Sequence, residues 1–302
     1  MGATVPLAAS VLRRPRRRID ARPYAFVLPL ILFEIGLVLV PLGIGFYYSL
    51  HRVDFFRLGD YVGFDNFVRV LTSPDVLRSL AVTATFTIWS LVFTFAVGFS
   101  LALYLERDTR TNVALRAIVL IPHVISLLVG SLLLRWILSA DAGVLALILN
   151  PVGLGDISIL GDPGRAMGAL VGNAIWRDTA FAMILLMAGL KGIPTQLYAA
   201  ARVDGATAWY TFRRITLPLM RMPVLITVVR LVIHFVNVLT FALVLTGGGP
   251  GSATRGVSLQ LYRLGFESYR FGQANALAML MMAFNVVLIL VLVRLFRQRG
   301  SA

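Results

Sequence analysis

The chain has 302 residues, of which 58% are hydrophobic and only 14% are charged, and its formal net charge is +14. Soluble domains carry about 25% charged residues, so this composition excludes an ordinary soluble protein and indicates one membrane domain that crosses the bilayer several times. There is no cysteine, which excludes disulfides, thiolate metal sites and cysteine nucleophiles. The basic residues lie mostly between apolar runs, where they orient a membrane protein, so we expect no nucleic-acid partner.

Six apolar stretches are each long enough to cross a bilayer, which needs about 20 mostly apolar residues. They cover residues 24–50, 79–105, 114–138, 166–190, 223–246 and 275–296. We therefore predict an all-α, polytopic fold with six transmembrane helices within residues 24–297, between a basic tail at 1–23 and a short tail at 298–302. The first stretch is too long for a signal-peptide core and has no cleavage site after it, so we interpret it as an uncleaved helix.

The distribution of Lys and Arg predicts the orientation. With the N-terminus inside, the inner segments carry 17 of these residues and the outer loops carry 8. Because cytoplasmic loops are enriched in Lys and Arg, both termini and the segment 191–222 are expected in the cytoplasm, with the protein in the plasma membrane. The basic tail is expected to be disordered or to lie on anionic lipid headgroups.

The segment 191–222 separates the fourth and fifth stretches. It is rich in small residues, and about half of it is polar. Pro194 starts a new helix over 195–203, Gly205 can adopt the left-handed conformation that ends it, and 206–214 form a second short helix. Trp209 and Phe212 then share one side of that helix. These residues predict a helix–turn–helix at the cytoplasmic surface, either a partner-binding element or an amphipathic linker on the lipid.

The spacing within this segment is more specific. Ala200-Ala201, Gly205 and "ITLP" (215–218) resemble the EAA loop of ABC importer permeases, which reads Glu-Ala-Ala, three residues, Gly, nine residues, Ile-x-Leu-Pro. "LMAGLKGIPTQLYAAARVDGA" is similar to the carbohydrate-uptake branch of that family, which includes maltose and glycerol-3-phosphate permeases. "YVGFDNFVRVL" (61–71) and "LTGGGPGSAT" (245–254) resemble the same branch, the latter its first-permease type. The similarity extends from about Tyr24 to the end of the chain.

The resemblance implies that the loop docks into a cleft on an ATP-hydrolysing subunit and transmits its closure to the helices. It implies a second permease, two ATPase subunits and an extracytoplasmic solute-binding protein as partners. The chain has no Gly-x4-Gly-Lys-Ser/Thr motif, so ATP and Mg would be bound by the ATPase, and we expect no catalytic residue, cofactor or metal on this chain. The coupling residues would be Ala199, Ala200, Arg202, Asp204, Gly205 and Trp209.

One position departs from the family pattern. The family's Glu falls on Ala199, which removes the carboxylate that pairs with a basic group on the ATPase. A surface ion pair is worth only ~1 kcal/mol or less, so its absence need not uncouple transport. We expect weaker docking for this subunit than for its partner permease.

Ionisable residues within membrane spans are costly and usually face a cavity or a partner. Arg177 and Asp178 lie in the fourth stretch, and Arg230 and His234 share a face of the fifth. In maltose-type permeases sugar contacts come from these two spans, and the loop register places them at Ala174, Arg177, Asp178, Phe181, His234, Phe235 and Val238. Asn173 and Asn237 complete the predicted substrate path.

Several alternatives remain open. Arg177 and Asp178 could instead pair with Arg230 or Glu34 to hold helices together, and Glu34 and Asn285 are expected to be structural hydrogen-bonders. One Arg beside one Asp favours a neutral sugar, but Arg177 also suits a sugar phosphate or glycerophosphodiester.

Other classes of protein fit the sequence less well. The histidines are scattered, with no Glu placed for a zinc site, so no enzyme is indicated. An ion-coupled secondary transporter would lose uptake when the proton gradient collapses. The resemblance also places "GGGP" (247–250) outside, beside the solute-binding protein.

Overall fold

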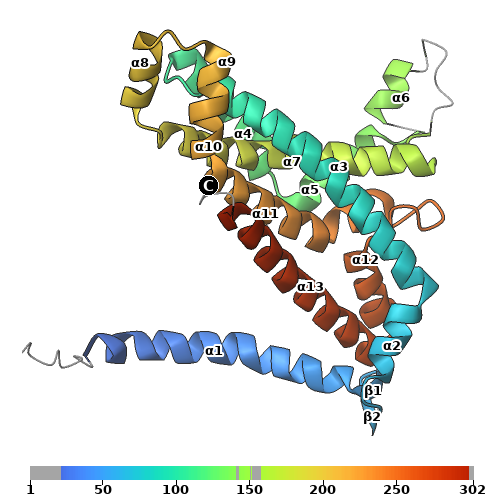
Figure 1. Cartoon of the computed structure of the whole chain (residues 1–302). Helices are drawn as coiled ribbons and strands as arrows, with labels where there is room; N and C mark the ends of the chain where they lie inside the picture. Colours follow the sequence, from blue (N-terminus) through green and yellow to red (C-terminus); the bar gives the residue numbers. More distant parts are fainter. Residues whose placement is uncertain (1–21, 141–142, 150, 152–157, 299–302) are drawn as a thin grey trace, which may run out of the picture. The chain divides into compact units, whose positions relative to one another are not determined.

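The computed structural model describes residues 22–140, 143–149, 151 and 158–298 (Figure 1). The chain divides into two compact units, residues 1–45 and 46–302. Nearly all of the predicted tails at 1–23 and 298–302 lies outside the described residues, so their cytoplasmic location stays a prediction.

The first unit contains most of helix α1 (Arg22–Ser49), which has Pro29 and Pro41 in its interior. Every side chain from Phe26 to Pro41 is exposed within this unit, including Glu34. A helix that is apolar on all sides is suited to lipid or to other helices rather than to water. The predicted first span is therefore a single helix.

The second unit is mostly helical. Its two strands are β1 (His51–Asp54) and β2 (Arg57–Tyr61). Its α-helices are α2 (Asp65–Thr72), α3 (Pro74–Tyr104), α4 (Arg110–Val124), α5 (Leu127–Ile137), α6 (Val144–Leu149), α7 (Pro163–Lys191), α8 (Thr195–Val203), α9 (Ala208–Thr211), α10 (Leu217–Leu219), α11 (Arg221–Asn237), α12 (Val257–Tyr262) and α13 (Phe271–Gln298). In the described part of the unit, three π-helical turns interrupt the series, η2 (Phe212–Thr216), η3 (Phe241–Thr246) and η4 (Arg263–Glu267).

The β1–β2 hairpin corrects the all-α prediction. The strands pair antiparallel, and the two residues between them, Phe55 and Phe56, have φ of 48° and 61°. Two-residue hairpin turns normally mark such positions with Gly, Asn or Asp, so this sequence gave no turn signal. Tertiary contacts hold the turn instead, because Phe55 N donates to Tyr269 O at 3.0 Å and the Phe55 and Tyr269 rings stack with centroids 5.4 Å apart.

Helices α3 and α7 form the most extensive helix pair of the unit and lie side by side in Figure 1. One face of α3 carries small buried residues at helical spacing, namely Thr87, Ser90, Thr94, Gly98 and Ala102. A Cβ on Gly98 would lie 2.7 Å from the Ala182 Cβ of α7. Small residues allow two backbones to approach closely, which is the packing used between helices in a membrane.

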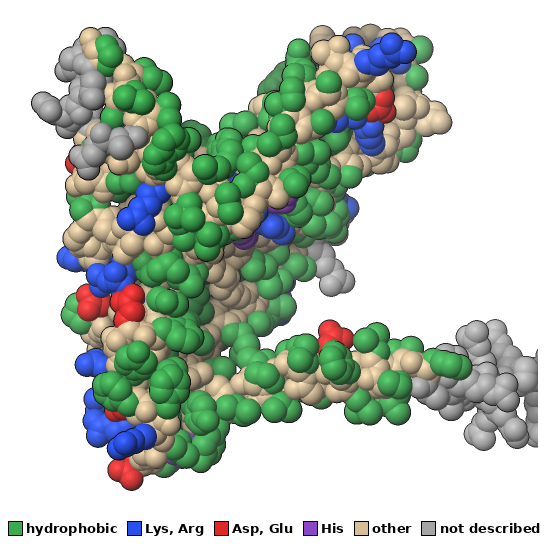
Figure 2. Space-filling view, turned by 180° about the vertical axis from the view of Figure 1, so that it is seen from behind, with side chains coloured by type: hydrophobic (Ala, Val, Ile, Leu, Met, Phe, Trp, Pro, Cys, Tyr) green, Lys and Arg blue, Asp and Glu red, His purple; other side chains and the backbone are tan. Residues whose placement is uncertain are grey.

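The loop that contains α8 and α9 lies at one end of this unit, and the hairpin and α2 lie at the other (Figure 1). Figure 2 shows hydrophobic side chains over much of the face in view, with charged side chains gathered near the hairpin end and further ones at the opposite end. Three buried apolar clusters form its core, around Leu190 and Met220, around Phe235 and Phe241, and around Val257 and Leu277.

Among the described residues, four helices are long and apolar enough to cross a membrane. Up to six spans result if two bent pairs, α4 with α5 and Ala208–Leu219 with α11, each count as one. The predicted third span is not one helix, because α4 and α5 meet at 92°. Ile125 and Ser126 are extended there, and Pro122 inside α4 cannot donate to the helix ladder. The predicted fifth span is also interrupted, since α11 ends at Asn237 and η3 begins only at Phe241.

Candidate substrate path and coupling loop

A buried carboxylate lies between α7 and α11 in the middle of the second unit. Only 1% of the Asp178 side chain is exposed, and its Oδ2 lies 3.4 Å from Nε2 of His234. Its Oδ1 lies 3.9 Å from Nη1 of Arg230. A buried charge requires partners, and here both come from one face of α11, at positions four residues apart.

Aromatic rings surround these polar groups. The guanidinium carbon of Arg230 lies 4.1 Å from the ring centroid of Phe181, which is cation–π geometry. The His234 ring lies 5.6 Å from that of Phe235 and 6.1 Å from that of Phe241. We call Asp178, Phe181, Arg230 and His234 the polar cluster. It combines an acceptor, two donor-bearing groups and an aromatic face.

The neighbouring Arg177 has a different environment. Its Nη1 donates to the carbonyl oxygens of Pro122 at 3.2 Å and of Ile125 at 2.5 Å. These carbonyls lie at the bend between α4 and α5, where the helical hydrogen bonds are interrupted. Adjacent residues on a helix point about 100° apart, so Arg177 serves the bend while Asp178 faces α11. Arg177 and Asp178 therefore do not form one site.

The other predicted path residues also make contacts between helices. Asn173 is buried and donates from Nδ2 to Oγ of Ser131 in α5 at 3.1 Å. Asn237 exchanges two hydrogen bonds with Asn285 of α13, at 3.3 Å and 3.1 Å. Phe235 is buried in the central apolar cluster. The expectation that Asn285 is a structural hydrogen-bonder is met.

The structure thus brings together three of the seven predicted path residues, Asp178, Phe181 and His234. It adds Arg230, which the sequence analysis named only as a structural partner for Arg177 and Asp178. The four-residue spacing of Arg230 and His234 was the available signal, because such residues share a helix face. Ser131 was missed altogether, since one Ser in an apolar stretch carries no pattern.

The loop between α7 and α11 has the predicted helix–turn–helix form. Helix α8 spans exactly the residues expected, 195–203, and Gly205 has φ of +71°. Thr207 caps α9 by accepting a hydrogen bond from Tyr210 N at 3.3 Å. The second helix is shorter than predicted, because α9 ends at Thr211 and continues as the π-helical turn η2.

The side of this loop that faces the rest of the second unit, its inner side, is packed against it. The opposite side, its outer side, has no such packing within the described chain. Ala201 is buried, and the Tyr198 hydroxyl lies 3.2 Å from Oγ1 of Thr216. On the outer side, Val203 is 89% exposed and Trp209 is 68% exposed, although the Trp209 ring stacks on Phe212 with centroids 5.8 Å apart. The remaining predicted coupling residues, Ala199, Ala200, Arg202, Asp204 and Gly205, are all exposed. Exposed apolar side chains at this place fit both alternatives that the sequence left open, contact with a partner and contact with lipid.

The chain is similar to known transport proteins over most of its length. It is 33% identical over 279 residues to the trehalose/maltose transport system permease protein MalF of Thermococcus litoralis, covering 91% of this chain and 94% of that protein. It is 29% identical over 268 residues to the sn-glycerol-3-phosphate transport system permease protein UgpA of Brucella abortus, covering 88% and 91%. A chain of the bacterial alginate ABC transporter, solved in complex with an alginate pentasaccharide-bound periplasmic protein, superposes with a TM-score of 0.79 at 27% identity, covering 94% and 96%.

The family described as "binding-protein-dependent transport system inner membrane component" matches residues 95–299. That range runs from within α3 to the end of α13 and includes both the polar cluster and the α8–α9 loop. More than half of the chain is covered, and the fold agrees. The chain belongs to this family of ABC transporter permeases.

Proposed function

We propose that this chain is a permease subunit of an ATP-driven sugar importer. The similarity to a trehalose/maltose permease along 91% of the chain carries the proposal. Six spans follow if each bent helix pair crosses the membrane once, and the Lys and Arg distribution then puts both termini in the cytoplasm. The family's dependence on binding proteins argues against an ion-coupled secondary transporter.

The α8–α9 loop is the proposed docking element for an ATPase subunit. Its exposed Val203 and Trp209 offer apolar contact, while Tyr198 ties α8 to Thr216 of η2 and packs against the buried cluster that contains Leu190 of α7. ATP and Mg would be bound by the ATPase. The full assembly would contain a second permease, two ATPase subunits and an extracytoplasmic solute-binding protein, a kind of partner that the alginate transporter structure contains.

The polar cluster is the proposed sugar contact on this subunit. Asp178 Oδ2, Arg230 Nη1 and His234 Nε2 have no hydrogen-bond partner among the described residues. Sugar hydroxyls both donate and accept hydrogen bonds, and sugar rings pack on aromatic faces such as Phe181. The predicted path would then run beside α7 and α11, with Asn173, Arg177, Phe235 and Asn237 holding its walls.

An anionic sugar derivative is the second candidate. Arg177 is occupied by backbone carbonyls, but Arg230 gives the cluster a cation, and one relative is named for sn-glycerol-3-phosphate. Because Asp178 already faces Arg230, a neutral sugar remains the better fit.

The test is uptake by proteoliposomes that contain the complete importer. We expect accumulation of a sugar to require enclosed ATP and the binding protein, and to continue when the proton gradient is collapsed. Uptake that ignores ATP and stops with the gradient would contradict the proposal. A ligand screen on the co-purified binding protein, with neutral sugars and sugar phosphates side by side, separates the two substrate classes.

A further inference from the structure

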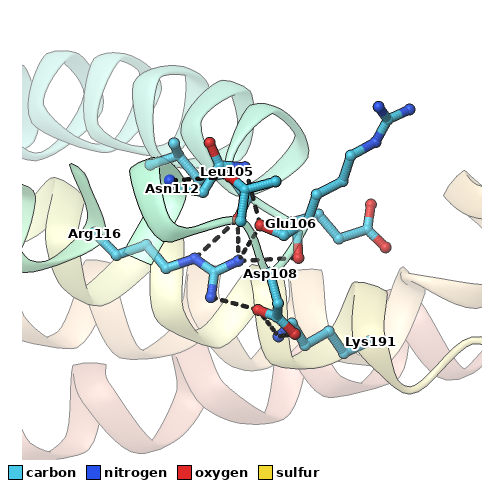
Figure 3. Close-up of polar contacts among 8 residues, drawn as sticks. Leu105, Glu106, Asp108, Asn112, Arg116 and Lys191 are labelled. Atoms are coloured by element: carbon cyan, nitrogen blue, oxygen red, sulfur yellow. Dashed lines mark hydrogen bonds and ion pairs between the residues drawn. The ribbon is translucent and has the colours of Figure 1, made fainter. Parts of the chain in front are cut away.

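The corner between α3 and α4 holds a cluster of polar contacts that the proposed function does not use (Figure 3). Both carboxylate oxygens of Asp108 accept from Nζ of Lys191, each at 2.8 Å. Oδ1 also accepts from Nη1 of Arg116 at 2.7 Å. Asp108 lies between α3 and α4, Arg116 lies on α4, and Lys191 is the last residue of α7. One carboxylate therefore connects α4 and α7 to the link between α3 and α4.

Arg116 is itself fixed in place by the end of α3. Its Nε donates to Leu105 O at 2.8 Å, and its Nη2 donates to the carbonyls of Glu106 and Arg107 at 3.0 Å each. Leu105 is the C-cap of α3 and Glu106 and Arg107 follow it, so these carbonyls lie at the helix C-terminus, which attracts cations. Only 14% of the Arg116 side chain is exposed. Asp108 is thus held by a guanidinium that cannot easily move away.

Apolar packing lies next to these polar contacts. Leu105 at the end of α3 is buried in one cluster with Leu190 of α7, Ile193 of the following connection and Met220 next to α10. Tyr198 of α8 packs against the same cluster. The base of the α8–α9 loop is therefore packed on the α3–α4 corner, and the Asp108 contacts lie at the edge of that packing.

Lys191 stands at the root of the loop, since only residues 192–194 separate it from α8. Hydrogen bonds from Lys191, and next from Arg116, hold the pKa of the Asp108 carboxyl below its ordinary value. A lowered pKa means that the contacts are complete above the ordinary value and are lost only as pH falls through the lowered one. Asp108 is consequently ionised at neutral pH.

We propose that Asp108 is a positioning residue for energy coupling, because through Lys191 and Arg116 it makes the α3–α4 corner and the root of the α8–α9 loop move as one body. This inference rests on the proposed docking of an ATPase on that loop. A displacement of α8 then reaches α3 and α4 as well as α7 and α11. Exposed ion pairs add little to stability, so the consequence of losing this one lies in how motion is transmitted.

The first test measures sugar molecules imported per ATP hydrolysed by the complete importer in proteoliposomes. Asp108→Asn and Lys191→Gln are each expected to lower this ratio about fivefold, the lower range of coupling between two sites, while the complex still assembles and hydrolyses ATP. Glu106→Gln is the matched control. Glu106 lies in the same corner, but it joins the contacts around Arg116 through its backbone carbonyl only (Figure 3). It should keep the normal ratio.

The second test measures the motion itself. The chain has no cysteine, so Thr111→Cys and Gln196→Cys, both at exposed positions, provide unique sites for spin labels on α4 and α8. In the otherwise unchanged protein the distance between the labels should stay the same in ATP-free and ATP-trapped states. In the Asp108→Asn background it should differ between the two states.

The inference is overturned if both variants keep the normal transport ratio, or if the label distance changes with ATP in the unsubstituted background. Should Asp108→Asn fail to assemble, Lys191→Gln decides the question, because it leaves the Arg116 contacts with Asp108 and α3 intact. Failure of the proposed function would be recognised separately, since the importer without any of these substitutions would then show no ATP-dependent uptake.

Discussion

The α8–α9 loop and the polar cluster both adjoin α7 and α11, but their side chains differ in exposure and in the contacts that they make. The residues on the loop's outer side are exposed, and their positions follow from local chain geometry. The cluster's residues are largely buried and oppose one another in charge across two helices, although Asp178 Oδ2, Arg230 Nη1 and His234 Nε2 make no hydrogen bond among the described residues. A substitution in the loop should therefore change coupling, whereas one in the cluster should first change stability.

The largest effect is expected at Asp178. Asp178→Asn leaves Arg230 without its counter-ion, and breaking a buried pair costs about 3 kcal/mol, somewhat less here because a third of the Arg230 side chain is exposed. Thermal unfolding of the purified complex in detergent should show a clearly lower midpoint.

The double variant Asp178→Asn/Arg230→Gln separates stability from substrate binding. Removing both charges leaves no uncompensated ion, so the unfolding midpoint should return towards normal. If the cluster contacts sugar, uptake stays low in this stable variant. Recovery of both properties would assign the cluster a structural role only.

A smaller effect is expected at Gly205. Its φ of +71° is unfavourable for a β-branched residue and costs about 1–2 kcal/mol in the turn. A Cβ there meets nothing within 4 Å, so the expected defect of Gly205→Val comes from backbone strain and not from a clash. ATP-driven uptake should fall about tenfold with assembly retained.

Gly205→Asn is the matched control, because Asn tolerates the left-handed region far better than Val. It should transport nearly as well as the unsubstituted protein. Equal defects in both variants would show that the partner requires the absence of a side chain, and normal transport by Gly205→Val would remove the turn from the coupling mechanism.

The same contrast explains what the sequence could predict. Helix α8 and the Gly205 turn are encoded by neighbouring residues, so their bounds were predicted correctly. The break at Ile125–Ser126 was missed because α4 and α5 together read as one apolar stretch, and its stabilising contact comes from Arg177, more than fifty residues away. The Phe55–Phe56 turn was missed for the same reason, since Tyr269 holds it.

In the site, residue types were predictable and their pairing was not. Spacing placed Arg230 and His234 on one face, but only the packing of α7 against α11 shows that Asp178 faces them while Arg177 faces the bend. Adjacent residues on a helix diverge by about 100°, so a dipeptide of opposite charges in a span is weak evidence for one common site.

Trp209 offers a finer test of the loop. Trp209→Ala removes an exposed ring that stacks on Phe212, and we expect about 1 kcal/mol weaker binding of the isolated ATPase, or about fivefold in affinity. Tyr210→Ala, the exposed neighbour, is the control. A titration of the ATPase onto the permease pair in nanodiscs measures both, and identical affinities would place the docking contact elsewhere on the loop.

The smallest effect is expected at the Asn237–Asn285 pair, where two helices are joined by uncharged hydrogen bonds. Asn285→Ala removes both hydrogen bonds between α11 and α13, but Asn237 keeps its bond to Ile233 O at 2.7 Å. Side-chain hydrogen bonds between membrane helices average about 0.6 kcal/mol, because the separated helices also find partners. Asn275→Ala, which removes a bond within α13 alone, is the control. If Asn285→Ala abolished uptake without lowering the unfolding midpoint, this amide pair would belong to the substrate path after all, as the sequence predicted for Asn237.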